Sequence, residues 1–144
     1  AEDRFSGSLI LDGHHLPSST AQVMIRAKGI ERVVLVSDSV KFAGMPPGRY
    51  SSPIGGDVEV SGNGRVSIFG TQFLAGSGVS LLKIICNFSN LIGLPFSDAV
   101  TMATKNPVDL TPGKRADFIL FDLDSVTGKV KPKDIIFGGE SVMQ

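Results

Sequence analysis

The first 40 residues alternate between apolar runs and a helical pattern. One apolar run lies in GSLILDGHH, from Gly7 to His15, and a second, RVVLVSDS, begins at Arg32. Between them, PSSTAQVMIRAKG predicts a helix that Ser18 or Ser19 caps and that Gly29 ends. Strands that are nearly all apolar and joined by a helix are typical of a βαβ unit in a parallel sheet with both faces covered.

The middle of the chain predicts a hairpin and two helices. DVEVSGNGRVSIFG alternates apolar and polar residues around Gly62-Asn63-Gly64, which is typical of a β-hairpin. LAGSGVSLLKIICNFSNLIG predicts a glycine-rich loop, able to offer backbone N–H groups to a ligand, followed by a strongly apolar helix. PFSDAVTMATKNP predicts another helix, with Ser97 as its N-cap and Pro107 at its end.

The last stretch, KRADFILFDLDSVTGKVKPKDIIFGGESV, predicts short antiparallel strands broken by glycine and proline. We therefore expect an α/β fold in two parts: residues 1–110 with two β/α units and an inserted hairpin at about 53–70, and a β segment at 111–144. Two parallel strands leave edges and faces uncovered, so they cannot form a stable layer alone. The chain therefore resembles the end of a larger protein.

The composition narrows the choice of partners and compartment. Of the 144 residues 42% are hydrophobic and 19% charged, which indicates a packed globular domain, and the positive mean hydropathy of +0.19 indicates surface that another segment covers. The net charge is +0 without a basic stripe, so nucleic acid and anionic membranes are not expected partners. The single cysteine, Cys86, excludes an internal disulfide and is expected to be a buried, inert thiol. A start without a signal-peptide pattern and the lack of a long apolar run favour a cytoplasmic protein.

Ionisable side chains follow both apolar strands: His14 and His15 come after the first, and Asp38 after the second. In parallel α/β folds the carboxyl ends of strands are where sites are built. Asp38 either turns or caps the chain or belongs to such a site, and the histidines are either a surface pair or part of it. The chemistry that would use them is metal-assisted hydrolysis, with a carboxylate that moves the proton of the attacking water. The chain has no other histidine and no complete ligand set, so no metal ligand is assigned here.

Five blocks in this order, LILDGHHL, RVVLVSDSVKFAGMPPGRY, FLAGSGVSLL, AVTMATKNPVDL and GKRADFILFD, resemble the C-terminal portion of the N-acetylglucosamine-6-phosphate deacetylases of the amidohydrolase superfamily. The resemblance spans essentially the whole chain. It implies the last two β/α units of a metal-dependent (β/α)₈ barrel, followed by strands of a small β-sandwich domain.

The resemblance also implies roles for individual residues. Asp38 matches the catalytic aspartate at the end of the last barrel strand, and His15 matches the histidine of an Asp-Gly-x-His block that contacts the sugar phosphate. The loop that closes over the sugar corresponds to Leu74, Ala75, Gly76 and Ser77. His14 falls on a variable position and receives no role.

The implied reaction converts N-acetylglucosamine 6-phosphate to glucosamine 6-phosphate and acetate, in a homo-oligomer. The implied cofactor is a divalent metal ion, zinc or iron, whose main ligands lie in an upstream part of the enzyme that this chain does not contain. This chain alone is therefore expected to be inactive. The step from Leu110 to Thr111 is about a dozen residues shorter than in the family. Two alternatives stay open: an amidohydrolase acting on a cyclic amide or aminopurine, and a non-catalytic fragment.

Overall fold

The computed structural model describes residues 2, 4–52, 55–109, 117–124, 130–138 and 140–143. The contacts divide the chain into two compact units, Ala1–Asn106 and Pro107–Gln144. Assigning the first unit to a barrel and the second to a β-sandwich stays a prediction. The shortened step at Leu110 and Thr111 lies outside the described residues.

The first unit contains the expected parallel pair. Strand β1 (Gly7–Leu9) pairs with β2 (Val33–Leu35), and Leu9 lies opposite Leu35. All three residues of β2 are buried, as a strand covered on both faces requires. The pair has two strands, so the described residues contain part of a parallel layer and not a closed barrel.

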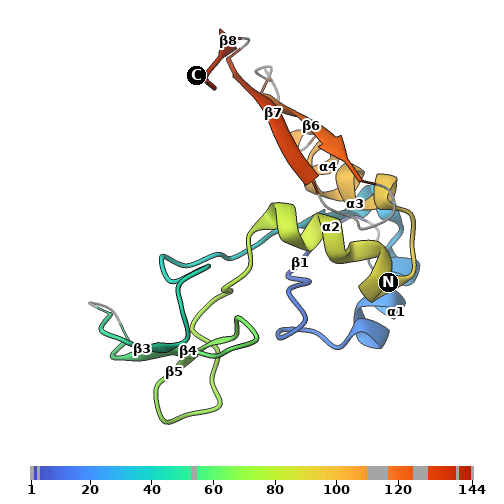
Figure 1. Cartoon of the computed structure of the whole chain (residues 1–144). Helices are drawn as coiled ribbons and strands as arrows, with labels where there is room; N and C mark the ends of the chain where they lie inside the picture. The colour runs from blue at the N-terminus through green and yellow to red at the C-terminus, as the bar shows by residue number, and fades with distance from the viewer. Residues whose placement is uncertain are drawn as a thin grey trace. The chain divides into compact units, whose positions relative to one another are not determined.

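Three helices pack around this pair (Figure 1). They are α1 (Ser18–Lys28), α2 (Leu81–Ile92) and α3 (Phe96–Ala103), and a 3-10 turn, Ile30–Arg32, leads into β2. The buried residues that they share with the strands form one hydrophobic core: Leu9, Leu11, Ala21, Ile25, Val33, Leu35, Val79, Ile84, Phe88, Ile92, Ala99 and Met102.

The two predicted serine N-caps are wrong because a proline precedes each helix, whereas Gly29 ends the first helix as predicted. Helix α1 begins at Ser18 with Pro17 as its N-cap, and the Pro17 carbonyl accepts a hydrogen bond from the Ala21 N–H at 3.0 Å. Helix α3 likewise begins after Pro95, so Ser97 lies inside its first turn. Neither helix has a side-chain cap hydrogen bond. The fixed φ of proline prepares the helix start without a capping side chain.

The prediction that Pro107 ends the helix in PFSDAVTMATKNP is also wrong. Helix α3 ends at Ala103, and a short helix α4 (Lys105–Asp109) contains Pro107 in its first turn, where a missing N–H costs nothing. Asn106 of α4 is only 4% exposed, and its Nδ2 donates 2.6 Å hydrogen bonds to the carbonyls of Ile30 and Val33. These bonds fix the start of β2.

Cys86 on α2 is half-buried rather than buried. Burial raises the pKa of its thiol above the ordinary value, so it carries little thiolate at neutral pH.

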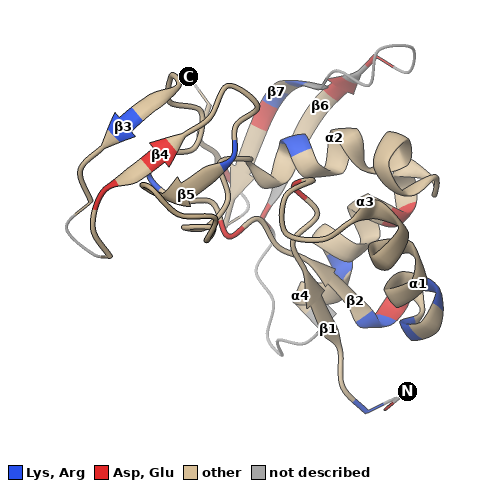
Figure 2. Ribbon diagram, turned by 90° about the horizontal axis from the view of Figure 1, so that it is seen from below, with Lys and Arg blue, Asp and Glu red and all other residues tan. Residues whose placement is uncertain are grey.

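The predicted hairpin is part of a three-stranded antiparallel sheet. Strand β4 (Val58–Val60) and β5 (Val66–Ile68) pair across the Gly62-Asn63-Gly64 turn, and β3 (Gly48–Tyr50) pairs with the other edge of β4. Figure 2 shows a basic residue on β3 beside an acidic one on β4, and Arg49 is the partner of Glu59 in the register. A second, smaller core supports this sheet through Phe42, Val58, Val60 and Val66.

The second unit is an antiparallel sheet, as predicted. Strand β7 (Val130–Phe137) pairs with β6 (Phe118–Leu123) on one edge and with β8 (Glu140–Ser141) on the other. Successive residues of β6, Ile119 and Leu120, are 47% and 50% exposed. Because neighbouring residues on a strand point to opposite faces, both faces of β6 carry exposed apolar surface.

In the described part of the chain, each helix is too short or too polar to cross a lipid bilayer.

Candidate functional site

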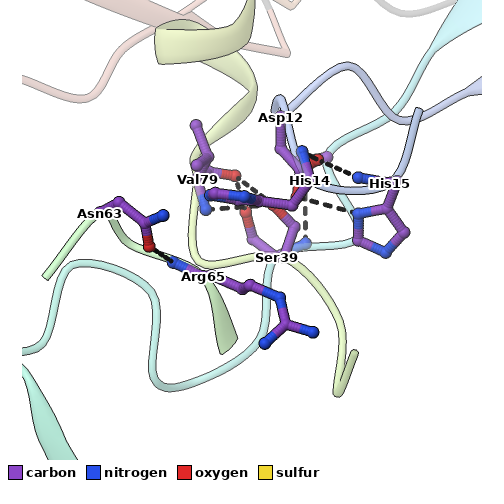
Figure 3. A network of polar contacts seen from close by, with 9 residues as sticks. Asp12, His14, His15, Ser39, Asn63, Arg65 and Val79 are labelled. Carbon is purple, nitrogen blue, oxygen red and sulfur yellow. Dashed lines mark hydrogen bonds and ion pairs between the residues drawn. The ribbon is translucent and has the colours of Figure 1, made fainter. Parts of the chain in front are cut away.

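The turn after β1 is organised by the carboxylate of Asp12. Its Oδ1 accepts hydrogen bonds from the backbone N–H groups of His14 at 2.9 Å and His15 at 3.0 Å. Its Oδ2 lies 2.9 Å from Nδ1 of the His15 ring. The Asp12 side chain is 1% exposed and that of His15 is 21% exposed. The buried Asp12 carboxylate therefore fixes the His15 ring through Nδ1 (Figure 3), while the ring itself remains partly exposed to solvent.

Asp12 is ionised despite its burial. Burial by itself would raise the pKa of this carboxyl group, but hydrogen bonds from the backbone of His14 and His15 and from the His15 side chain, together with the nearby Ser77 hydroxyl, outweigh it and lower the pKa below its ordinary value. The Ser77 hydroxyl itself is bonded to the backbone of Val79: it accepts from the N–H at 3.1 Å and donates to the carbonyl at 3.4 Å.

Asp38 lies three residues beyond the end of β2, where the backbone turns. Its φ is +51°, and it is the one non-glycine residue with positive φ in the described chain. Such a conformation is uncommon, although aspartate tolerates it better than most residues. Asp38 is exposed, and in the described structure no hydrogen bond or ion pair engages its carboxylate. The chain therefore turns at Asp38 but does not use this carboxylate as a cap.

The segment from Leu74 to Ser77 runs between β5 and Asp38. On one side the Ala75 N–H donates to the Val66 carbonyl at 3.0 Å. On the other, the Ser77 N–H donates to the Asp38 carbonyl at 2.9 Å. Two of the N–H groups expected to face a ligand are thus used within the chain.

These contacts join the predicted site residues into two pairs. The His15 ring is bonded to Asp12, and the Ser77 N–H is bonded to the Asp38 carbonyl. Ser77 is completely buried, so it lies beneath the site rather than on its surface. Gly76 lies beside the Asp38 side chain, because a Cβ atom built on it would lie 3.6 Å from Asp38 Oδ2.

Sequence reasoning assigned no role to Asp12. The signal was present in the Asp-Gly-His-His sequence, because aspartate commonly accepts hydrogen bonds from backbone N–H groups two or three residues further on. The contacts of Asp12 are therefore local, within three residues along the chain.

An apolar cavity beside Ala75 is separate from these residues. It has a volume of about 470 Å³, includes Ala75 in its lining, and is lined by neither His15 nor Asp38. The described residues contain no group of three or more His, Cys, Asp or Glu side chains able to hold a metal ion. They therefore do not form a site for the zinc or iron ion that the resemblance implies.

Replacing Gly76 by alanine should destabilise the first unit. The residue has φ +84°, and an added Cβ would lie 2.3 Å from Val40 Cγ1 and 3.2 Å from the Asp38 carbonyl oxygen. Left-handed backbone and overpacking together should cost about 2 kcal/mol or more. Urea unfolding followed by far-UV circular dichroism measures this loss. Gly70→Ala is the matched control, because Gly70 has φ +76° but no atom within 4 Å of the added Cβ. Equal losses in both variants would contradict the close packing at Gly76.

Comparison with known proteins shows which family the chain belongs to. The chain is 36% identical over 125 residues to a protein of Escherichia coli (strain K12) named as a candidate N-acetylgalactosamine-6-phosphate deacetylase, a match that spans 79% of this chain and 72% of that protein. The chain belongs to the family of N-acetylglucosamine- and N-acetylgalactosamine-6-phosphate deacetylases. No family model matches it.

Other members of this deacetylase family are much longer than the chain. It is also 36% identical over 125 residues to the N-acetylgalactosamine-6-phosphate deacetylase of Escherichia coli O157:H7, but spans only 32% of that protein. Among solved structures, it aligns with a Mycobacterium smegmatis N-acetylglucosamine-6-phosphate deacetylase variant in complex with N-acetylglucosamine 6-phosphate, with a TM-score of 0.79 and 26% identity. That alignment covers 99% of this chain and 39% of the Mycobacterium chain. The chain thus corresponds to roughly a third of these two relatives.

Proposed function

We propose that a protein containing this chain removes the acetyl group from an N-acetylhexosamine 6-phosphate, giving acetate and the free amine. The observation that supports this most is the exposed Asp38 carboxylate, which follows β2 in a member of the deacetylase family and has no other described partner. A carboxylate kept out of the local hydrogen bonds is available to move protons.

In this proposal Asp38 is the general base and then the general acid. It takes a proton from the water whose oxygen adds to the acetyl carbon. It then gives that proton to the amide nitrogen as the carbon–nitrogen bond breaks. The Asp38 backbone is fixed by Ser77, which keeps the carboxylate in one place for both transfers.

His15 and the segment Leu74–Ser77 bind the sugar phosphate in this proposal. Nδ1 of His15 is occupied by Asp12, so Nε2 is the ring nitrogen left to meet the substrate. A phosphate oxygen only accepts hydrogen bonds, so the ring meets it as the imidazolium, which donates through Nδ1 to Asp12 and through Nε2 to the phosphate. Leu74, Ala75 and Gly76 are half-buried, and their exposed fraction supplies apolar contact beside Asp38.

The preferred sugar is a separate question. N-acetylglucosamine 6-phosphate is the substrate that the sequence blocks suggest, and the Mycobacterium relative was solved with it. N-acetylgalactosamine 6-phosphate, which differs only at C4, is the second candidate because the two E. coli relatives at 36% identity carry that name.

Acetate release from the two sugar phosphates tests the proposal. A purified protein that contains this chain and the upstream part of its relatives should release acetate from at least one of them, and the faster reaction identifies the substrate. The 144-residue chain alone should release none. Release of acetate from neither sugar by the longer protein would contradict the proposed function. It would favour the alternative of a non-catalytic fragment.

A further inference from the structure

Asp12 is a buried carboxylate that follows the first strand of the parallel pair, whereas Asp38 follows the second. Its side chain is 1% exposed and has three hydrogen-bond partners: the His14 N–H, the His15 N–H and Nδ1 of the His15 ring. A buried carboxylate needs such partners, and here two of the three belong to His15, a proposed site residue.

The two carboxylate oxygens of Asp12 bind different groups. Oδ1 accepts both backbone N–H groups, from His14 and His15, and thereby shapes the turn. Oδ2 faces Nδ1 of the His15 ring. Because an ionised carboxylate cannot donate a hydrogen bond, Nδ1 carries the proton and the neutral ring leaves Nε2 unprotonated.

We propose that Asp12 is the positioning residue of His15: through Oδ1 it holds the turn that carries this histidine, and through Oδ2 it selects the tautomer and orientation of the ring. Asp12 touches neither the scissile amide nor the substrate in this arrangement. The inference rests on the proposed function only for what His15 does, since the contacts are a property of the chain itself.

Asp12→Asn gives a sharp test because it changes one atom. The asparagine Oδ1 can keep both backbone hydrogen bonds, so its NH₂ group must face the His15 ring in place of Oδ2. An amide NH₂ donates, so Nδ1 must then accept. The variant should therefore switch neutral His15 from the Nδ1-protonated to the Nε2-protonated tautomer.

Long-range ¹H–¹⁵N spectra of the ¹⁵N-labelled 144-residue chain, recorded where imidazole is neutral, report this tautomer directly. The chain has only two histidines, and His14 is an internal reference because its described bond to Asp12 runs through the backbone N–H alone. The His14 ring should not change in Asp12→Asn. Asp57→Asn, which removes an exposed carboxylate paired with Arg49, is the matched control and should change neither ring.

The tautomer measurement tests the role of Asp12 independently of the proposed function. A His15 ring that keeps the same tautomer in wild type and Asp12→Asn overturns the positioning role. A wild-type ring that shows a mixture of tautomers, whether from a missing contact or an unfolded turn, overturns it as well. Titration with N-acetylglucosamine 6-phosphate is a separate measurement: unchanged His15 signals would count against the phosphate contact and leave the tautomer result standing.

Discussion

Asp38→Asn should lower the rate of acetate release by about 10²- to 10⁴-fold, the usual contribution of a general acid–base residue. Asparagine has nearly the same shape but cannot take or give the proton. It also tolerates the left-handed backbone that Asp38 adopts at φ +51°, so the fold should be retained. The loss should fall on kcat, with KM for the sugar phosphate little changed, because the proposed step comes after binding.

The measurement uses the same longer protein as the substrate test, with kcat and KM determined on the better sugar phosphate. Asp57→Asn is the control, because Asp57 is a carboxylate of the same chain that pairs with Arg49 on the β3–β5 sheet. Its kinetics should match the unmodified protein. An Asp38→Asn variant whose kcat stays within about threefold of the unmodified protein would show that Asp38 only turns the chain, because general acid–base groups contribute at least about a hundredfold.

Phe88→Ala should produce the largest loss of stability among single changes in the first unit. Phe88 on α2 is completely buried in the core that also contains Ile84, Leu35 and Met102. Removing a buried phenylalanine ring typically costs about 3–5 kcal/mol, since the neighbours only partly close the cavity. With the urea dependence usual for small domains, the unfolding midpoint should fall by at least about 1 M.

Far-UV circular dichroism is the suitable probe, because the chain has no tryptophan and a single tyrosine. Phe73→Ala is the matched control: Phe73 is 73% exposed, and its removal should change the free energy of unfolding by about 0.5 kcal/mol or less. Similar midpoints for Phe88→Ala and Phe73→Ala would contradict the packed core.

Strand β2 was predictable because its sequence is uniformly hydrophobic. A run such as Val33–Leu35 has no polar face, so only a strand covered on both sides accommodates it. The Gly62-Asn63-Gly64 turn was predictable for a similar local reason, and β4 and β5 pair across it. The helices Ser18–Lys28 and Leu81–Ile92 followed from their composition and from the glycines that end them.

Features with two competing local signals were predicted less well. Ser97 is a good capping residue, but Pro95 already prepares the helix start. Pro107 often ends a helix, yet here it lies in the first turn of the next one. The third strand, Gly48–Tyr50, was hidden in a proline-glycine turn region and exists because β4 offers it an edge.

The sequence alone determined which residue types stand at the strand ends: an aspartate and two histidines after β1, and an aspartate after β2. Chain order and hydrophobic pattern suffice for this, because a strand ends where its apolar run ends. Only the tertiary structure decided that Ser77 fixes the backbone of Asp38. A hydrogen bond between residues 39 positions apart depends on how the segment after β2 and the segment after β5 come together, and no local sequence pattern determines that contact.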